Sequence, residues 1–319
     1  MAITLADAQV NTQDDVDYFV IDEFRKSSAL LDAMTFDDAV TPGVGGATLT
    51  YGYNRVTVER AAAFRAVNNE YVAADAKRDR YTVDLKPLGG SFGVDRVLAN
   101  LGPAASNEVN FQFEQLAKSV RTRFQDELIN GDVAADANGF DGLDKALTGS
   151  ATEVTGTRNW TNASITSEVK AQEALDELDE LLALLDGPAT ALLGNIKSIG
   201  RVRALARRSG YYTRTEDAFG RLVESYGNVI LIDLGAKAGS NDPIIPVTAG
   251  VTDLYAVRLG LDGLHGVSLA GAPLVQTFLP DFTQPGAVKK GEAEMVTAMA
   301  LKATKAVGVL RGITVAAAE

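Results

Sequence analysis

The sequence predicts an α+β protein, and three features of the 319-residue chain carry that prediction. Residues 44–86 have the pattern of a long β-hairpin, and residues 106–130 have the pattern of one long amphipathic helix. Residues 190–280 mix short strands with short helices. Strands and helices mixed in this way are typical of the α+β class, and the length allows one large or two medium domains.

The predicted hairpin follows the turn-forming residues 42–46, which include one proline and three glycines. Along its return strand, residues 80–86, polar and apolar side chains alternate, as on a strand with two unlike faces. On the first strand of the hairpin, the apolar side chains change from odd-numbered to even-numbered positions, so we expect a β-bulge near Asn54. A lone two-stranded ribbon is marginally stable in water, so this hairpin needs another surface on which to lie.

Two apolar stripes at helical spacing flank the hairpin. Residues 13–34 are expected to form one or two amphipathic helices with Phe19 and Phe24 in the stripe, and these pack either on the chain's own core or on a partner. Ser106 is a suitable N-cap for the helix 106–130, which ends at an Asn-Gly pair. At a rise of about 1.5 Å per residue, this helix is about 36 Å long.

The second half of the chain carries several shorter elements. A helix over 167–186 is expected to bury an apolar stripe that includes Val169 and to expose an acidic face to solvent. The acidic side chains are Glu173, Asp176, Glu177, Asp179 and Glu180. Further patterns predict a helix over 196–208 and strands over 191–193, 229–233, 254–259, 267–269, 292–303 and 307–315.

The composition limits the classes of function. The net charge of −12 argues against a protein that binds nucleic acid by neutralising its phosphates. It does not argue against a container for DNA, because an acidic inner wall would repel the phosphates and leave the DNA free to move. Solubility alone explains the charge equally well. No run of 18 uncharged apolar residues occurs, so we expect no membrane span. The absence of cysteine excludes disulfides and thiolate metal sites.

One short motif suggests catalysis. Residues 89–93 are G-G-S-F-G, which matches the nucleophile elbow of serine hydrolases, and the single histidine, His265, lies downstream of Ser91. An elbow needs a buried apolar strand before the serine, whereas here the preceding strand is polar on alternate residues. One histidine without cysteine also gives too few of the usual ligands for a zinc site. We therefore expect no catalytic residue, no cofactor and no metal, and a protein that is not an enzyme.

Basic side chains gather on the predicted helix 196–208. They are Lys197, Arg201, Arg203, Arg207 and Arg208. Two interpretations remain open: a solvated helix face, or a contact with an acidic neighbouring copy of the same chain. The second would suit a chain with a net negative charge.

The order of the motifs resembles one known family. Residues 88–96 are L-G-G-S-F-G-V-D-R, the long helix follows, and residues 140–143 are F-D-G-L. This order resembles the HK97-fold major capsid proteins of tailed bacteriophages. The resemblance implies an N-arm over 1–43, an E-loop hairpin over 44–86, a P-domain over 87–188 with its spine helix at 106–130, an A-domain over 189–285 and C-terminal P-domain strands over 286–319.

The resemblance also implies a function. Such subunits self-assemble into pentamers and hexamers that close into an icosahedral shell around double-stranded DNA. We therefore expect a structural protein of the virion that is assembled in the bacterial host cytoplasm, away from any membrane. Expected partners are other copies of the chain, a separate scaffolding protein, a portal and a decoration protein, with DNA enclosed but not bound by sequence. Encapsulins, which are bacterial shells that hold cargo enzymes, share the fold and are the alternative.

Candidate contacts between subunits follow from these assignments. They are Phe19 and Phe24 of the N-arm, Arg55, Arg60, Arg65, Lys77, Arg78 and Arg80 of the E-loop, and Arg201, Arg207 and Arg208 of the A-domain. The E-loop arginines are expected to pair with a neighbour's carboxylates. Some relatives also join an E-loop lysine to a neighbour's asparagine, but no asparagine follows Asn241 here, so we expect shells without covalent links.

Overall fold

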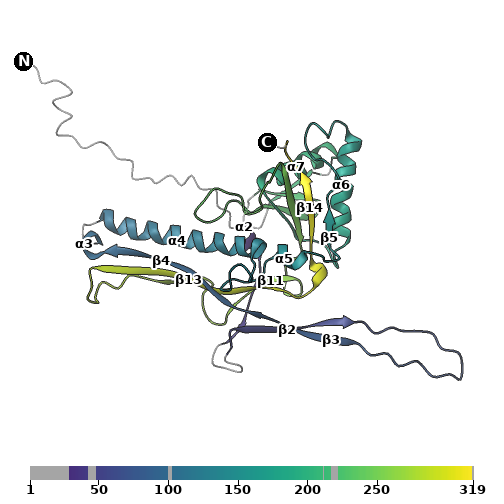
Figure 1. The fold of residues 1–319 in the computed structure, drawn as a ribbon, viewed down its shortest axis with the longest axis horizontal. Coiled ribbons are helices and arrows are strands. Elements are labelled where there is room, and N and C mark those ends of the chain that lie inside the picture. Colours follow the sequence, from purple (N-terminus) through teal and green to yellow (C-terminus); the bar gives the residue numbers. More distant parts are fainter. Residues whose placement is uncertain (1–28, 42–47, 100–102, 211, 217–221, 318–319) are drawn as a thin grey trace, which may run out of the picture.

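The computed structural model describes residues 29–41, 48–99, 103–210, 212–216 and 222–317. Within them the chain forms two β-sheets, a separate β-hairpin and helices that pack on the sheets (Figure 1). Phe19, Phe24 and most of the predicted N-terminal helix lie outside the described residues.

A five-stranded sheet and one long helix form the elongated half of the molecule (Figure 1). Its elements are α2 (Ala29–Ala33), β1 (Phe36–Val40), β4 (Lys86–Asp95), α3 (Arg96–Ala99), α4 (Pro103–Asn130), β11 (Leu264–Leu269), β12 (Gln276–Phe278) and β13 (Val288–Leu301). Strand β13 pairs antiparallel with the whole of β4, and α4 runs along both strands. Phe113 of α4 meets Phe92 of β4 edge-on, with 4.7 Å between ring centroids.

A seven-stranded sheet with three helices forms the second half. Its elements are α5 (Leu143–Leu147), β5 (Glu153–Thr155), α6 (Glu168–Ala183), β6 (Ala191–Gly194), α7 (Ile196–Arg208), β7 (Tyr212–Glu216), β8 (Leu222–Tyr226), β9 (Val229–Asp233), β10 (Val251–Val257) and β14 (Val307–Thr314), the last preceded by a 3₁₀ turn, Thr304–Ala306. The strand order is β5-β14-β10-β6-β9-β8-β7. Helices α6 and α7 begin at side-chain caps: Ser167 accepts from the Lys170 amide, and Asn195 forms a capping box with Ser198.

One hydrophobic core joins the two halves. It contains Phe124 and Leu128 of α4, Met295 of β13, and Tyr255 and Val309 of the seven-stranded sheet. Because both sheets contribute side chains to the same core, the long helix and the two sheets stabilise one another.

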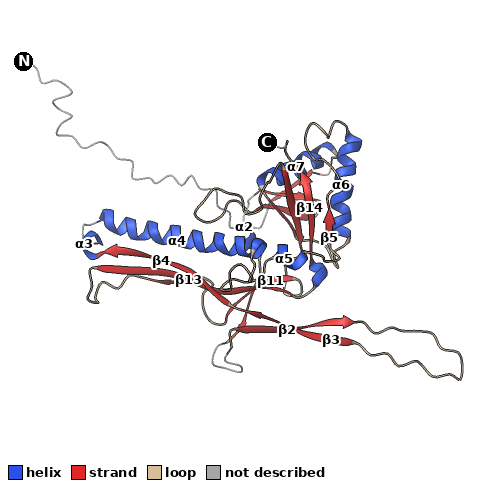
Figure 2. Cartoon of the chain, viewed as in Figure 1, coloured by secondary structure: helices blue, strands red, loops and turns tan. Residues whose placement is uncertain are grey.

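The predicted hairpin is present, with strands β2 (Thr50–Val58) and β3 (Lys77–Asp84) in antiparallel register. The register shifts between Val56 and Val58, close to the bulge expected near Asn54. The hairpin projects away from the five-stranded sheet, and the long connection between its strands extends furthest (Figure 2).

The base of the hairpin is fixed by burial. Leu85 is 2% exposed and packs with Val267 of β11 in a small apolar cluster. Tyr51, Tyr53 and Val83 lie against the same cluster. The surface on which this ribbon lies is therefore, at its base, the chain's own five-stranded sheet.

Residues 29–40 pack on the chain's own core. Leu30 and Met34 are buried in the main cluster, and β1 adds to the five-stranded sheet by pairing parallel with β11. The sequence leaves two packing surfaces open for the N-terminal apolar stripe, the chain's own core or a partner. The part of the stripe within residues 29–40 packs on the chain's own core.

Three local predictions are wrong. Helix α4 begins at Pro103, about one turn before Ser106, because proline suits the first turn of a helix, where an amide hydrogen has no partner. Val169 is 62% exposed, whereas Glu177 is buried and accepts hydrogen bonds from the amide and the hydroxyl of Thr157. Those two bonds replace water, so Glu177 does not belong to the solvated acidic face.

Each of the two sheets combines strands from more than one of the predicted segments. The sequence predicts that β14 joins β13 beside the long helix, whereas β14 lies between β5 and β10 in the seven-stranded sheet. Strand β11, expected within residues 189–285, pairs with β13 in the five-stranded sheet. Which sheet a strand joins depends on pairing between residues far apart in sequence, and a local pattern does not encode it.

Candidate interaction surfaces

The connection between the hairpin strands, residues 59–76, exposes apolar side chains. Phe64 is fully exposed, Val72 is 93% exposed, and Val67 and Tyr71 are exposed as well. No other described part of the chain covers them. Large apolar side chains gathered at the end of an extended ribbon are typical of a surface that another molecule covers.

Arg65 and Arg80, which the sequence predicts to contact a neighbouring subunit, lie against the hairpin itself. Arg65 donates from Nη1 to the carbonyl oxygens of Ala66 at 3.2 Å and Asn69 at 3.1 Å, so it shapes the loop in which it lies. Arg80 lies over Gly52, where a Cβ atom would come within 3.1 Å of the guanidinium.

Arg55 anchors the hairpin to its own sheet. Its Nε donates to the Lys302 carbonyl at 2.9 Å, and its Nη2 donates to the Leu301 carbonyl. Its guanidinium also stacks 4.2 Å from the ring centroid of Tyr81, which in turn stacks on Tyr53. Within its own chain the Arg55 guanidinium is thus bound to backbone and aromatic groups, and its pairing with a neighbour's carboxylate stays a prediction.

The other three hairpin cations are exposed to solvent. They are Arg60, Lys77 and Arg78. Within the described part of the chain their side chains form no hydrogen bond or ion pair, so they remain the hairpin's candidates for contact with a neighbour's carboxylates.

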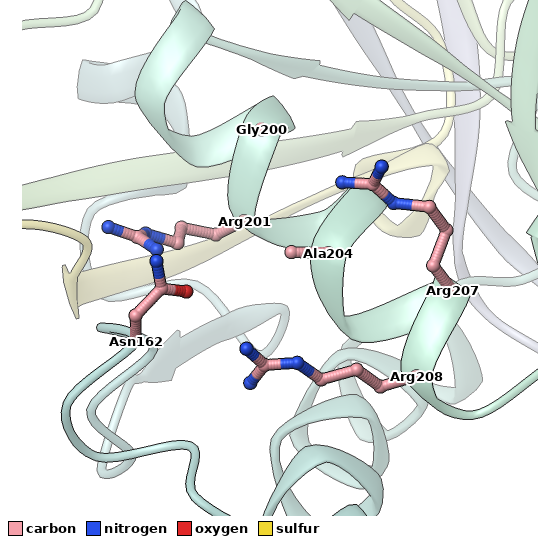
Figure 3. A pocket seen from close by; sticks show the side chains of 6 residues that line it. All are labelled: Asn162, Gly200, Arg201, Ala204, Arg207 and Arg208. Atoms are coloured by element: carbon pink, nitrogen blue, oxygen red, sulfur yellow. The ribbon is translucent and has the colours of Figure 1, made fainter.

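Arg201, Arg207 and Arg208 are brought together by the turns of α7. With Asn162, which no sequence pattern indicated, they line a hollow of about 500 Å³ (Figure 3). None of the three arginines forms an ion pair with a carboxylate of the described residues, whereas their neighbour Arg203 pairs with Glu224.

Each of these guanidinium groups is oriented by one backbone carbonyl. Arg201 donates to Val315 at 2.9 Å, and Arg208 donates to Ile165 at 2.7 Å. Arg207 donates only within its own helix. An arginine side chain has five N–H donors, so each keeps others for a partner.

The exposed face of α6 is acidic, as predicted, apart from Glu177. Glu173 and Asp179 have partners within the chain, an arginine and a tyrosine hydroxyl. Asp176 and Glu180 are exposed and form no hydrogen bond or ion pair among the described side chains. They lie four residues apart, which places two like charges side by side on the helix surface.

Arg311 forms the densest charged network of the described chain. Its guanidinium contacts Asp144 Oδ1 at 2.5 Å, Asp253 Oδ2 at 3.4 Å and Glu153, and the Tyr255 hydroxyl donates to Asp144 at 3.0 Å. Burial alone would lower the pKa of Arg311, but its hydrogen bonds to Asp144 and Glu153 outweigh that effect and raise it. Burial, helped by the nearby carboxylates, raises the pKa of Tyr255. The network connects α5, β5, β10 and β14, and no sequence pattern indicated it.

The serine and histidine of the hydrolase motif are far apart. Ser91 lies inside the regular strand β4 opposite Glu292, and His265 lies in β11 opposite Ala300. Eight positions of β13 separate these partners, which is about 27 Å along a strand. His265 is also fully buried, and burial lowers its pKa. A Ser91–His265 catalytic pair is therefore excluded by this fold.

The described residues contain neither a candidate metal site nor a helix that could span a membrane. Among the described residues, no group of three or more histidine or carboxylate side chains is placed to hold a metal ion. None of the described helices combines the length and the apolar character needed to cross a membrane.

No model of a known protein family matches the chain, and no curated protein matches its sequence. Solved structures match its fold over almost the whole length. The holo-SrpI encapsulin complex from Synechococcus elongatus gives a TM-score of 0.68 at 16% identity, covering 100% of this chain and 99% of that one. The capsid of the native GTA particle gives 0.64 at 12% identity, covering 98% and 99%. The capsid of Myoviridae phage XM1 gives 0.60 at 13% identity, covering 98% and 99%.

These likenesses confirm the predicted fold. The chain is an α+β protein with the HK97-like architecture of phage capsid proteins, an architecture that the encapsulin shares. At such low sequence identity the likeness establishes the fold and nothing finer.

Proposed function

We propose that the protein is a structural subunit of a self-assembling capsid shell and not an enzyme. The observation that carries the proposal is the projecting hairpin, whose loop 59–76 exposes Phe64 and Val72 to water. A neighbouring copy that covered these side chains would gain the free energy of burying apolar surface. The fold shared with solved capsid and encapsulin structures supports the same conclusion.

The finer proposal is a major capsid protein of a tailed bacteriophage. Its pentamers and hexamers would form an icosahedral virion shell around double-stranded DNA, assembled in the host cytoplasm with a separate scaffolding protein, a portal and a decoration protein. The net charge of −12 supports enclosure of DNA without phosphate-neutralising contacts, since like charges repel across the inner wall.

The second candidate is an encapsulin-like shell that holds a cargo protein. The likeness to the SrpI encapsulin complex, with a TM-score of 0.68 over 100% of this chain, favours it. The two candidates differ in what the particle contains, because one encloses DNA and the other encloses protein.

The test is assembly of the full chain. We expect light scattering after size-exclusion chromatography, together with negative-stain images, to show capsomers or closed shells. Nuclease-protected DNA inside native particles would support the phage proposal, and a co-purifying cargo protein without DNA would support the encapsulin-like one. A 33.7 kDa monomer under all conditions, including coexpression with a scaffolding protein, would overturn both.

A further inference from the structure

The hollow beside α7 gathers positive charge that its own chain does not neutralise. Arg201, Arg207 and Arg208 line it, and no described carboxylate forms an ion pair with any of them. Three guanidinium groups around one hollow repel one another unless an anion lies between them. The hollow is therefore suited to an anionic group that the isolated chain does not supply.

The position of these arginines on the helix does not account for the whole cluster. Arg207 and Arg208 lie in the last turn of α7, where cations interact favourably with the helix dipole. Arg201 lies about two turns earlier and gains nothing from that end of the helix. Its Nε bond to the Val315 carbonyl instead aims the guanidinium into the hollow beside Asn162 (Figure 3).

A complementary group is present elsewhere on the same chain. Asp176 and Glu180 of α6 are exposed carboxylates four residues apart, without a described cation partner. Their Cβ atoms are about 5–6 Å apart on one helix face, so both carboxylates can enter one hollow. Guanidinium groups bind carboxylates in a two-pronged geometry, which makes the pairing specific as well as favourable.

We propose that the hollow formed by Arg201, Arg207 and Arg208 binds Asp176 and Glu180 of a neighbouring copy of this chain. The inference rests on the proposed shell function, and it names the contact by which two subunits recognise each other. A carboxylate partner is favoured over a nucleic-acid phosphate because the chain carries a net charge of −12 and would repel DNA as a whole.

The experiment compares assembly of full-length variants under one set of conditions. Arg207→Glu is the first variant, because the Arg207 side chain bonds only within α7 and its loss breaks no contact to another element. Glu180→Lys is the second variant, and the chain with both changes restores opposite charges with reversed sign. Arg121→Glu, an exposed arginine of α4, is the matched control. Thermal unfolding by circular dichroism checks that each variant is folded.

We expect Arg207→Glu and Glu180→Lys each to lower the yield of assemblies by roughly tenfold or more, because like charges then face each other across the contact. The doubly changed chain should recover most of the wild-type yield, and Arg121→Glu should match the wild type. Unchanged assembly of Arg207→Glu, or a double variant that is not rescued, overturns the inference while the shell function stands. If Arg207→Glu forms normal shells that no longer retain DNA, the hollow binds DNA phosphate, and this result also overturns the inference. A wild-type chain that never assembles overturns the proposed function and this inference together.

Discussion

Replacing Arg311 with alanine should destabilise the subunit more than any exposed charge change. The guanidinium contacts Asp144, Glu153 and Asp253, and Nη2 also donates to the Asp144 carbonyl at 3.0 Å. Without it, three carboxylates remain close together with no cation among them. Strand β14 would then lose its charged connection to α5 and β5 while keeping its backbone pairing.

The size of the effect follows from the exposure of the network. Breaking a fully buried ion pair costs about 3–5 kcal/mol, and an exposed pair contributes about 0–1 kcal/mol. The Arg311 side chain is 23% exposed, and its partners are 21% to 46% exposed. The expected loss in the free energy of unfolding is therefore about 2–3 kcal/mol, between these limits.

The assay is urea unfolding of the unassembled subunit, followed by circular dichroism at pH 7. Arg158→Ala is the control, because Arg158 is 52% exposed and pairs with Glu173 alone, so its loss should cost less than about 1 kcal/mol. A loss for Arg311→Ala no larger than that of the control would refute the reasoning.

The same network gives a pH dependence. The Gly149 amide, and after it Arg311, hold the pKa of Glu153 below its usual value of 4.5. A carboxyl whose folded-state pKa is depressed adds stability above its unfolded pKa and loses it as the pH falls. The difference between wild type and Arg311→Ala should therefore be full above about pH 4.5 and should shrink below it. A difference that stays constant down to acid unfolding would contradict this assignment.

Four further predictions concern assembly and chemistry. Deleting residues 61–77 should leave thermal unfolding of the subunit unchanged and prevent shells from forming, and intact shells would argue against a bridging hairpin. Boiled mature particles should give a single band near 33.7 kDa on a denaturing gel, because no covalent link is expected, and a ladder of larger bands would reveal a bond from Lys77 or Lys86. Ser91 should resist fluorophosphonate labelling, and labelling of Ser91 that depends on His265 would support the hydrolase interpretation. Immature shells should loosen in about 1 M salt, where the Debye length is about 3 Å, and indifference to salt would point to apolar contacts instead.

Local signals in the sequence were sufficient for many elements. The predicted bounds of helix α7 and strand β9 match the structure. Ser167 caps the N-terminus of α6, a position that serine favours. In each case neighbouring residues carry the information, through helical periodicity, an apolar strand pattern or a capping side chain. The hairpin was likewise predictable from the alternation on β3 and the glycines before β2.

The candidate interaction surfaces were predictable only in part. The basic face of α7 follows from its sequence, but the hollow also needs Asn162, which a separate loop brings beside the helix. Arg55 looked like any other hairpin cation, and only the fold places the carbonyls of Leu301 and Lys302 within its reach. A charged side chain on a strand has the same local pattern whether it meets its own chain or a neighbour's.

The α+β class, the hairpin and the positions of most helices were predictable from the sequence alone, because these features depend on residues a few positions apart. The folded chain alone reveals that β11 joins the five-stranded sheet packed on α4 and that β14 joins the seven-stranded sheet. The fold also turns Glu177 inward to Thr157 and places three carboxylates around Arg311. These outcomes depend on contacts between residues that are distant in sequence, and the shared core that brings both sheets together sets them.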